Sequence, residues 1–196
     1  MKTIVFDIDG VLADWSTGFS QWAQSVFPEV PVVTHANCAA WDVRPGMTPE
    51  MERVIWSLIK QDARFWRDLP SLATERELRA ISELIYQGHR VYFATNRKTP
   101  RALAATRDWL EARLHTDAVN VIITHRKGEF CKVVDADYYI DDKSENVDCA
   151  IWMTDTKTKS YVITRPYNSV IYAPHSKSAR RVSTVLEFVE DINAEI

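Results

Sequence analysis

The chain has 196 residues, 46% of them hydrophobic and 26% charged, and a formal net charge of −3. These values fit a folded protein with one main core and room for a small subdomain, and they argue against disorder. The slight negative charge argues against broad attraction to nucleic acid or to an anionic membrane surface.

Cysteine usage and the N-terminus indicate the compartment. Cys38, Cys131 and Cys149 are widely separated and form no CxxC pair, which is more typical of a reducing compartment than of a disulfide framework or a zinc site. No apolar run approaches membrane-spanning length, and Asp7 and Asp9 interrupt the apolar stretch that a signal peptide would need. We therefore expect a cytoplasmic protein with no membrane partner.

The N-terminal segment MKTIVFDIDG predicts a short buried strand that ends in two acids. Asp7 and Asp9 alternate with Ile8, so an extended backbone would point both carboxylates to the same side. Two like charges this close repel each other, and one pKa should rise unless a cation lies between them. The segment therefore predicts a site for a cation, a proton or water.

Helical and strand-like patterns follow along the chain. Residues 13–71 are rich in tryptophan and contain two amphipathic helical patterns, at 19–27 and 49–61. Further helices are expected at 74–88, 99–114, 127–134 and 178–192, with Gly88 ending the first of them. Strands are expected at 89–95, 120–124, 137–142 and 160–164.

This alternation predicts an α/β fold of the doubly wound type, with a mostly parallel sheet covered by helices on both faces. We expect residues 1–12 and 72–196 to form this core, and residues 13–71 to form a small helical cap inserted after the first strand. In such sheets, ligands bind at the carboxyl ends of the strands. The sequences DID, ATN, ITHRK and IDD all lie at predicted strand ends.

The polar residues at those four ends fit phosphate chemistry. Carboxylates around one point make a hard-oxygen site that suits Mg²⁺. A hydroxyl, an amide and an ammonium beside that cation can donate hydrogen bonds to a phosphate. One carboxylate can attack phosphorus, and a second acid can protonate the leaving oxygen and later deprotonate water. The residues concerned are Asp7, Asp9, Thr95, Asn96, Lys127, Asp141 and Asp142.

These residues carry a resemblance to a known superfamily. DIDGV, ATN, Lys127 with Gly128, and IDDKSENV are similar to the four motifs of the haloacid-dehalogenase-type phosphohydrolases. More specifically, the chain resembles the small nucleotidases of the 5′(3′)-deoxyribonucleotidase group and their phage and bacterial relatives. The segments that carry this closer resemblance, in order, are DIDGVLADW, FWRDLP, TNR, TRDWL, KGEFCK, IDDKSENV and RPYN. It spans nearly the whole chain and implies a Rossmann-like core.

The resemblance implies a role for each acid. Asp7 would be the nucleophile and a magnesium ligand. Asp9 would be the general acid/base and would also bind the metal through its backbone carbonyl. Asp142 would ligate the metal, and Asp141 would act directly or through water. The cation would supply charge neutralisation and orientation rather than a metal-bound hydroxide.

The resemblance also implies a phosphate cradle and a base pocket. Thr95 and the Asn96 backbone would hold the transferring phosphoryl group, and Lys127 would offset the charge on phosphate and nucleophile. Trp15 and Trp41 are candidates for lining a base pocket. The tryptophans at helical spacing among apolar residues are expected in the core instead; they are Trp22, Trp56 and Trp109.

Several basic residues depart from the pattern of the group or leave alternatives open. Arg101 and Arg107 are the only basic residues between 100 and 113, where mammalian members of the group carry several. The segment from Lys127 to the acidic pair is longer than in those members, which keeps Lys132 as an alternative to Lys127. Arg165 would pair with phosphate or with a surface acid, and we favour the surface acid.

The sequence thus predicts a magnesium-dependent phosphomonoesterase that hydrolyses nucleoside 5′-monophosphates, deoxynucleotides foremost, through an aspartyl-phosphate. One alternative is a polynucleotide 3′-phosphatase, against which the lack of a basic surplus argues. Another is a catalytically silent nucleotide-binding protein of the same fold. The expected partner is a nucleoside monophosphate and not a nucleic acid, and a homodimer is left open.

Overall fold

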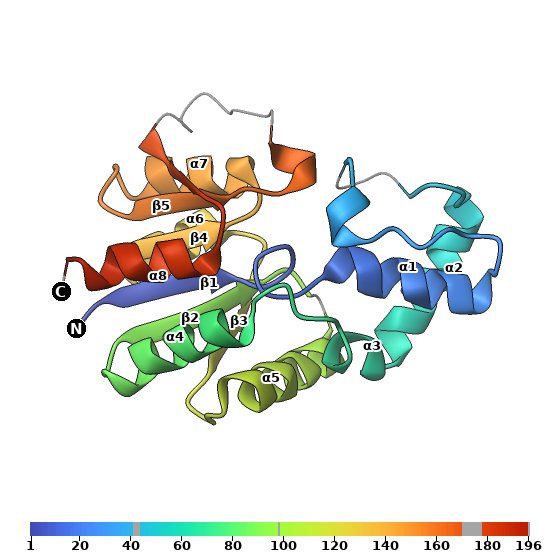
Figure 1. The fold of residues 1–196 in the computed structure, drawn as a ribbon, viewed down its shortest axis with the longest axis horizontal. Coiled ribbons are helices and arrows are strands. Elements are labelled where there is room, and N and C mark those ends of the chain that lie inside the picture. The colour runs from blue at the N-terminus through green and yellow to red at the C-terminus, as the bar shows by residue number, and fades with distance from the viewer. Residues whose placement is uncertain (41–43, 98, 170–177, 196) are drawn as a thin grey trace.

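A six-stranded parallel sheet forms the centre of the computed structural model, which describes residues 1–40, 44–97, 99–169 and 178–195 (Figure 1). The strand order is β3-β2-β1-β4-β5-β6, and each recorded pair is parallel. The strands are β1 (Thr3–Asp7), β2 (Arg90–Thr95), β3 (Asn120–Ile123), β4 (Tyr138–Asp141), β5 (Lys159–Ile163) and β6 (Arg180–Val182). The chain order reverses beside β1, and such a switch point opens a crevice at the carboxyl strand ends.

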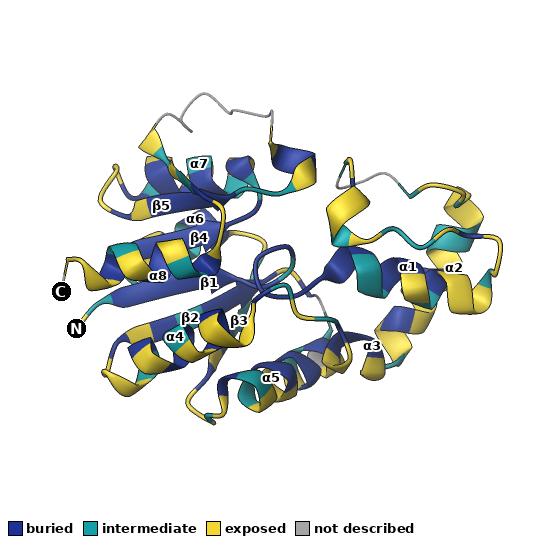
Figure 2. Cartoon of the chain, viewed as in Figure 1, coloured by how far each residue is buried: buried dark blue, intermediate teal, exposed yellow. Residues whose placement is uncertain are grey.

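Helices cover both faces of this sheet, which confirms the doubly wound α/β prediction. The strand β1 is buried along its length (Figure 2). Ile4 and Phe6 of β1 lie in one apolar cluster and Val5 lies in another, because successive strand residues point to opposite faces. The first cluster includes α4 (Glu75–Tyr86), α5 (Pro100–Leu114) and α8 (Val185–Asn193). The second includes α6 (Lys127–Val133) and α7 (Ser144–Met153).

The segment between β1 and α4 lies to one side of the sheet, beyond the carboxyl end of β1 (Figure 1). It contains α1 (Trp15–Val26), the 3-10 turn η1 (His35–Asn37), α2 (Pro49–Gln61) and α3 (Arg64–Arg67). The chain leaves and returns along neighbouring paths, because the Asp14 amide donates to the Pro70 carbonyl at 2.8 Å and the Leu72 amide to the Leu12 carbonyl at 2.7 Å. These paired connections support the division into a core and a cap at residues 12/13 and 71/72, which stays a prediction.

Two predicted elements differ in the C-terminal half. The helix expected over 178–192 begins only at Val185, because Arg180–Val182 pair with β5 as the edge strand and Thr184 caps the helix by accepting from the Glu187 amide. The helix α7 forms over SENVDCAIWM, where the sequence predicted no helix. Among the described residues, no helix has the length and apolar character needed to cross a membrane.

Glu77 joins two helices on one face of the sheet. Its side chain is buried, and Oε2 accepts hydrogen bonds from the amide and the hydroxyl of Thr74, the N-cap of α4, at 2.7 and 2.8 Å. Its Oε1 accepts from the amides of Val185 at 2.8 Å and Leu186 at 3.3 Å, which begin α8. One carboxylate therefore satisfies backbone donors at two helix N-termini.

We expect Glu77→Ala to lower the free energy of unfolding by about 2–4 kcal/mol, because it leaves the buried Val185 amide without an acceptor. Glu83→Ala, at an exposed position of the same helix, is the control and should change it by less than about 0.5 kcal/mol. Urea unfolding curves measure both variants. Equal effects of the two substitutions would contradict the bridging role.

Candidate active site

Asp7 lies at the end of β1, beside the switch point, and its carboxylate is buried. Its Oδ1 accepts a hydrogen bond from the Ile8 amide at 2.7 Å and lies 2.6 Å from Nζ of Lys127, the first residue of α6. Lys132, the alternative lysine, is exposed one helical turn further on. Of the two candidate lysines, the structure therefore brings Lys127 to Asp7.

Asp141, at the end of β4, has donors on both oxygens. Oδ2 accepts from Nζ of Lys127 at 2.8 Å and from the Tyr139 hydroxyl. Oδ1 accepts from the Lys143 amide at 2.8 Å, and Nδ2 of Asn146 lies 3.1 Å from each oxygen. Asp141 therefore orients Lys127, and its own oxygens are already engaged, which favours contact with a metal through water over direct contact.

Only one of the two carboxylate oxygens of Asp142 accepts a hydrogen bond. Its Oδ2 accepts from the Tyr167 hydroxyl at 2.6 Å, and Nδ2 of Asn168 donates to its backbone carbonyl at 2.6 Å. Its Oδ1 is buried without a hydrogen-bond partner. Because a buried carboxylate oxygen without a partner is costly, Oδ1 is the atom in this site that best fits a metal ligand.

Burial and the charges of neighbouring groups shift the pKa values of these three acids. One oxygen of each of Asp7, Asp141 and Asp142 lies within 4.8 Å of the others. Burial and the charge of Asp141 raise the pKa of Asp7 to about 7. Burial and the same neighbour raise the pKa of Asp142 well above its ordinary value. For Asp141, burial acts upward, but Lys127 and the hydrogen bonds outweigh it, so its pKa is lowered.

The cluster fits a hard divalent cation. Carboxylate oxygens are the ligands that such ions prefer, and a dication between them would compensate the buried negative charge, whose burial and mutual repulsion raise the two pKa values. Three of the predicted metal residues, Asp7, Asp141 and Asp142, are thus brought together. Asp9 is not part of this cluster, since β1 ends at Asp7 and the chain turns at Ile8. The metal contact expected of its backbone carbonyl stays a prediction.

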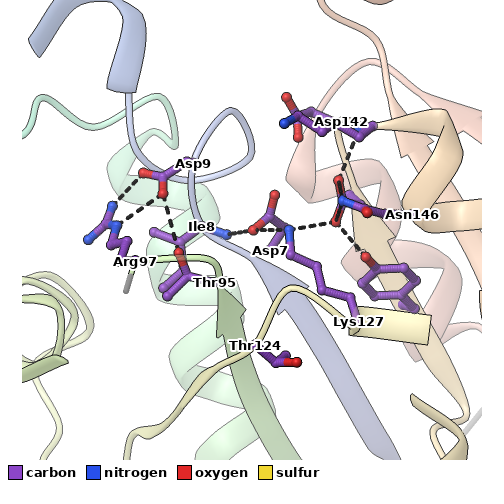
Figure 3. A network of polar contacts seen from close by, with 12 residues as sticks. Asp7, Ile8, Asp9, Thr95, Arg97, Thr124, Lys127, Asp142 and Asn146 are labelled. Carbon is purple, nitrogen blue, oxygen red and sulfur yellow. Dashed lines mark hydrogen bonds and ion pairs between the residues drawn. The ribbon is translucent and has the colours of Figure 1, made fainter. Parts of the chain in front are cut away.

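The Asp9 carboxylate is held by Arg97, which follows β2. Nη2 of Arg97 lies 2.5 Å from Oδ1 and Nε lies 3.0 Å from Oδ2, while the Thr95 hydroxyl donates to Oδ2 at 3.3 Å. Figure 3 shows the Asp9 carboxylate turned toward Arg97, with Asp7 between Asp9 and Asp142 in this view. Arg97 was not among the predicted site residues, although TNR was part of the resemblance.

The loop after β1 packs against the acidic cluster through a glycine. Gly10 has φ +87°, and a Cβ there would lie 2.4 Å from Oδ2 of Asp142 and 2.6 Å from the Tyr167 hydroxyl oxygen. Arg165 donates from Nε to the Gly10 carbonyl at 2.6 Å and from Nη2 to the Val11 carbonyl at 3.1 Å. Arg165 therefore supports the backbone of this loop, and the expectation that it pairs with a surface acid is wrong.

A cavity of about 410 Å³ opens beside the cluster. Asp141 is fully buried and does not line the cavity itself, but it is hydrogen-bonded to three residues that do: Lys127, Lys143 and Asn146. Trp41 lies outside the described residues. The other predicted site residues all line the cavity: Asp7, Asp9, Trp15, Thr95, Asn96, Lys127 and Asp142.

Tryptophans from the segment between β1 and α4 line the same cavity. Trp15 of α1 and Trp56 of α2 have stacked rings with centroids 5.8 Å apart, and Trp66 of α3 joins them in the lining. Trp56 was expected in the core, but it is half-buried, because one side of its ring packs on the core and the cavity lies beside it. Trp109 is 1% exposed, which confirms its predicted place in the core.

The raised pKa values predict how stability depends on pH. A carboxyl whose pKa is about 7 in the folded chain and about 3.8 when unfolded destabilises the fold progressively as pH rises between those values. In EDTA, stability should therefore fall across this window, and the stabilisation added by MgCl₂ should grow, because the cation competes with protons. Melting temperatures at pH 5, 6, 7 and 8 measure both effects.

Asp142→Asn is the matched variant for that series. It removes the negative charge from Oδ1, the oxygen that best fits a metal ligand, so the difference between MgCl₂ and EDTA should shrink at every pH, and with it the pH dependence of that difference. A magnesium effect that is equally large in Asp142→Asn, or that is independent of pH in the wild type, would contradict the proposed linkage.

Gly10 and Gly88 offer a second matched pair, because both have positive φ, +87° and +81°. Open space surrounds a Cβ at Gly88, so Gly88→Ala should cost about 1–2 kcal/mol of backbone strain. Gly10→Ala should cost at least about 1 kcal/mol more, because the methyl group overlaps Asp142. Chemical denaturation measures this difference, and magnesium stabilisation should be lost in Gly10→Ala alone. If the two variants lost the same free energy of unfolding and kept the same magnesium stabilisation, the close approach of Gly10 to Asp142 would be contradicted.

Comparisons with known proteins agree with this architecture. The family model described as "5' nucleotidase, deoxy (Pyrimidine), cytosolic type C protein" matches residues 1–188. No curated protein sequence matched the chain.

Several solved structures share the fold at low identity. A HAD family hydrolase from Deinococcus radiodurans R1 with bound phosphate and sodium has a TM-score of 0.63 and 14% identity, covering 99% of this chain and 96% of that one. A hydrolase from Pseudomonas syringae has a TM-score of 0.58 and 14% identity, covering 99% of each chain. A predicted phosphoglycolate phosphatase from Haemophilus somnus 129PT has a TM-score of 0.56 and 12% identity, covering 98% of each chain.

At such identities the structural likeness establishes the haloacid-dehalogenase fold alone. The family model spans nearly the whole chain and confirms the resemblance to the deoxyribonucleotidase group. The protein therefore belongs to the family of deoxy (pyrimidine) 5′ nucleotidases of cytosolic type C, and it is a phosphoric monoester hydrolase.

Proposed function

We propose that the protein is a magnesium-dependent nucleotidase that hydrolyses nucleoside 5′-monophosphates, deoxynucleotides foremost, through an aspartyl-phosphate on Asp7. The observation that carries the proposal is the buried cluster of Asp7, Asp141 and Asp142, with Lys127 ion-paired to two of them, at the wall of the 410 Å³ cavity. A nucleophilic carboxylate, a dication and a phosphate ester can meet there and nowhere else that we identify among the described residues.

Asp7 is the nucleophile in this proposal. In the first step one of its oxygens attacks phosphorus, and the bond from phosphorus to the nucleoside 5′ oxygen breaks. Asp9 donates a proton to that oxygen, so the nucleoside leaves as a neutral alcohol. In the second step Asp9, now ionised, takes a proton from water, whose oxygen attacks phosphorus and releases inorganic phosphate and the Asp7 carboxylate.

The register of the sheet supports the phosphate cradle. Asp7 pairs with Ala94 of β2, so Thr95 and Asn96 follow directly beyond the nucleophile on the neighbouring strand. The Thr95 hydroxyl and the Asn96 amide would hold the transferring phosphoryl oxygens, and Nζ of Lys127 would balance their charge. All three residues line the cavity.

The donor set supports magnesium as the cofactor. Asp7 and Oδ1 of Asp142 would ligate the ion directly, and Asp141 would act through water, because its oxygens already accept other hydrogen bonds. When bound, Mg²⁺ would neutralise charge on the phosphoryl group and hold it in line with Asp7.

The cap side of the cavity supports a nucleoside as the leaving group. Trp15, Trp56 and Trp66 supply aromatic surface on which a base can stack, and the Arg44 guanidinium lies 4.8 Å from the Trp15 ring centre. Trp41 remains a predicted base contact. The preference for deoxynucleotides rests on the family to which the chain belongs.

Asp7→Asn preserves the shape of the side chain but removes the nucleophilic charge. We expect kcat on a deoxynucleoside 5′-monophosphate to fall by at least about 1,000-fold, with the circular dichroism spectrum unchanged. Asp108→Asn, at an exposed position of α5, is the control and should keep the wild-type rate. Phosphate release is measured in MgCl₂ and again in EDTA, which should abolish the wild-type activity.

Each other outcome of that assay has a definite meaning. A wild-type rate for Asp7→Asn would remove Asp7 as the nucleophile. Equal rates on free 5′-monophosphates and on oligonucleotide 3′-phosphates would favour the polynucleotide 3′-phosphatase. No phosphate release from any ester in MgCl₂ would favour a silent nucleotide-binding protein.

A further inference from the structure

We propose that Arg97 is the positioning residue of the general acid/base, fixing the Asp9 carboxylate so that one free edge faces the cavity, and that Trp66 makes this alignment depend on the cap. The inference rests on the proposed function, because it takes Asp9 as the group that protonates the leaving oxygen. It extends that function to two residues that do not themselves react: Arg97, which holds Asp9, and Trp66, which contacts Arg97.

The guanidinium of Arg97 forms a bidentate ion pair with the Asp9 carboxylate. Nη2 of Arg97 contacts Oδ1 at 2.5 Å and Nε contacts Oδ2 at 3.0 Å. A bidentate contact of this kind fixes the plane of a carboxylate as well as its position, which one lysine ammonium cannot do. The Arg97 side chain is 1% exposed and that of Asp9 is 17% exposed, so the buried partner anchors the more accessible one.

The hydrogen bonds leave little freedom in how Asp9 acts. An ionised carboxylate offers about four acceptor sites, two on each oxygen. Arg97 occupies one site on each oxygen, and the Thr95 hydroxyl donates to Oδ2 at 3.3 Å. The remaining site on Oδ1 is open to a proton shared with the leaving oxygen or with water, and a site on Oδ2 opens as well when the Thr95 hydroxyl, which has a single hydrogen, turns to a bound phosphoryl oxygen. Asp9 lines the cavity, so this edge is within reach of a bound ester.

Arg97 is itself held on two further sides. Its Nη1 donates to the Thr106 hydroxyl of α5 at 2.7 Å, and its guanidinium carbon lies 4.9 Å from the centre of the Trp66 ring. Trp66 belongs to α3 of the cap segment and lines the same cavity. A cation–π contact in a desolvated place is strong enough to bias where a guanidinium lies. The orientation of Asp9 is therefore linked, through Arg97, to the position of the cap.

An ion pair that only stabilised the fold would be equally buried, so the test must separate a role in positioning Asp9 from a role in stability. Two substrates whose leaving groups differ in their need for a proton make this separation. p-Nitrophenolate leaves without a proton, whereas the alkoxide of a nucleoside 5′-monophosphate needs one, so a misplaced general acid harms only the nucleotide reaction. The value of kcat/KM reports the steps up to loss of the leaving group and excludes the later attack by water.

The experiment compares kcat/KM for p-nitrophenyl phosphate and for a deoxynucleoside 5′-monophosphate in MgCl₂. Arg97→Lys keeps the charge but loses the bidentate contact, and it should lower the nucleotide value by about 10- to 100-fold while p-nitrophenyl phosphate changes by less than about threefold. Thr106→Val removes one anchor of Arg97 with little change in shape, and it should shift the ratio in the same direction by a smaller factor. Arg107→Lys, exposed on α5, is the control and should leave the ratio unchanged.

Two outcomes would overturn the positioning role. One is an equal loss on both substrates in Arg97→Lys, and the other is no loss on either. Removing the bidentate contact from a buried ion pair also destabilises a protein, so melting temperatures accompany the kinetics. If Arg97→Lys does not fold, Thr106→Val decides the question by the same ratio, because Thr106 contacts Arg97 and is not part of the cavity lining. An unchanged ratio in Thr106→Val would then count against the inference.

Asp9→Asn separates this inference from the proposed function. It should lower the nucleotide value by about 100- to 10,000-fold and the p-nitrophenyl phosphate value much less. If Asp9→Asn fails to discriminate between the two leaving groups, Asp9 is not the general acid and the proposed mechanism fails. If it discriminates and Arg97→Lys does not, the mechanism stands and the role of Arg97 is refuted.

Discussion

Three buried carboxylates that meet around one lysine are the constraint on which the rest of the site depends. Asp7, Asp141 and Asp142 are each less than 5% exposed, and Lys127 forms ion pairs with the first two. Such an excess of negative charge in a buried place is unfavourable unless protons or a cation compensate it. The raised pKa values of Asp7 and Asp142 show that protons can provide this compensation. In phosphoryl transfer a divalent cation would provide it instead.

The fold brings these acids together through strand order rather than through local sequence. Because β1 and β4 are neighbours in a parallel sheet, Asp7 and Asp141 reach the same edge although they are far apart in the chain. Residues after β5 then complete the arrangement: Tyr167 binds Asp142, and Arg165 binds the loop that follows β1. Residues from the C-terminal part of the chain therefore hold the acidic cluster and the loop after the N-terminal strand in place.

The sequence predicted which residues meet at the carboxyl edge of the sheet better than it predicted the residues that hold them there. The rule that parallel strands present their carboxyl ends together placed Asp7, Lys127 and Asp142 correctly in one cavity. The same rule could not show that Asp9 turns to Arg97, because that depends on how the chain bends after β1. Helical periodicity placed Trp56 in the core, since an apolar face that meets a cavity has the same spacing as one that meets other side chains.

The most direct test of the central claim is to locate the metal. In crystals soaked with Mn²⁺ as a stand-in for Mg²⁺, anomalous scattering should place one ion at about 2.2 Å from an oxygen of Asp7 and from Oδ1 of Asp142. No ion there at millimolar Mn²⁺, or an ion bound away from both side chains, would contradict the view that the buried acids exist to share a cation beside a phosphoryl group.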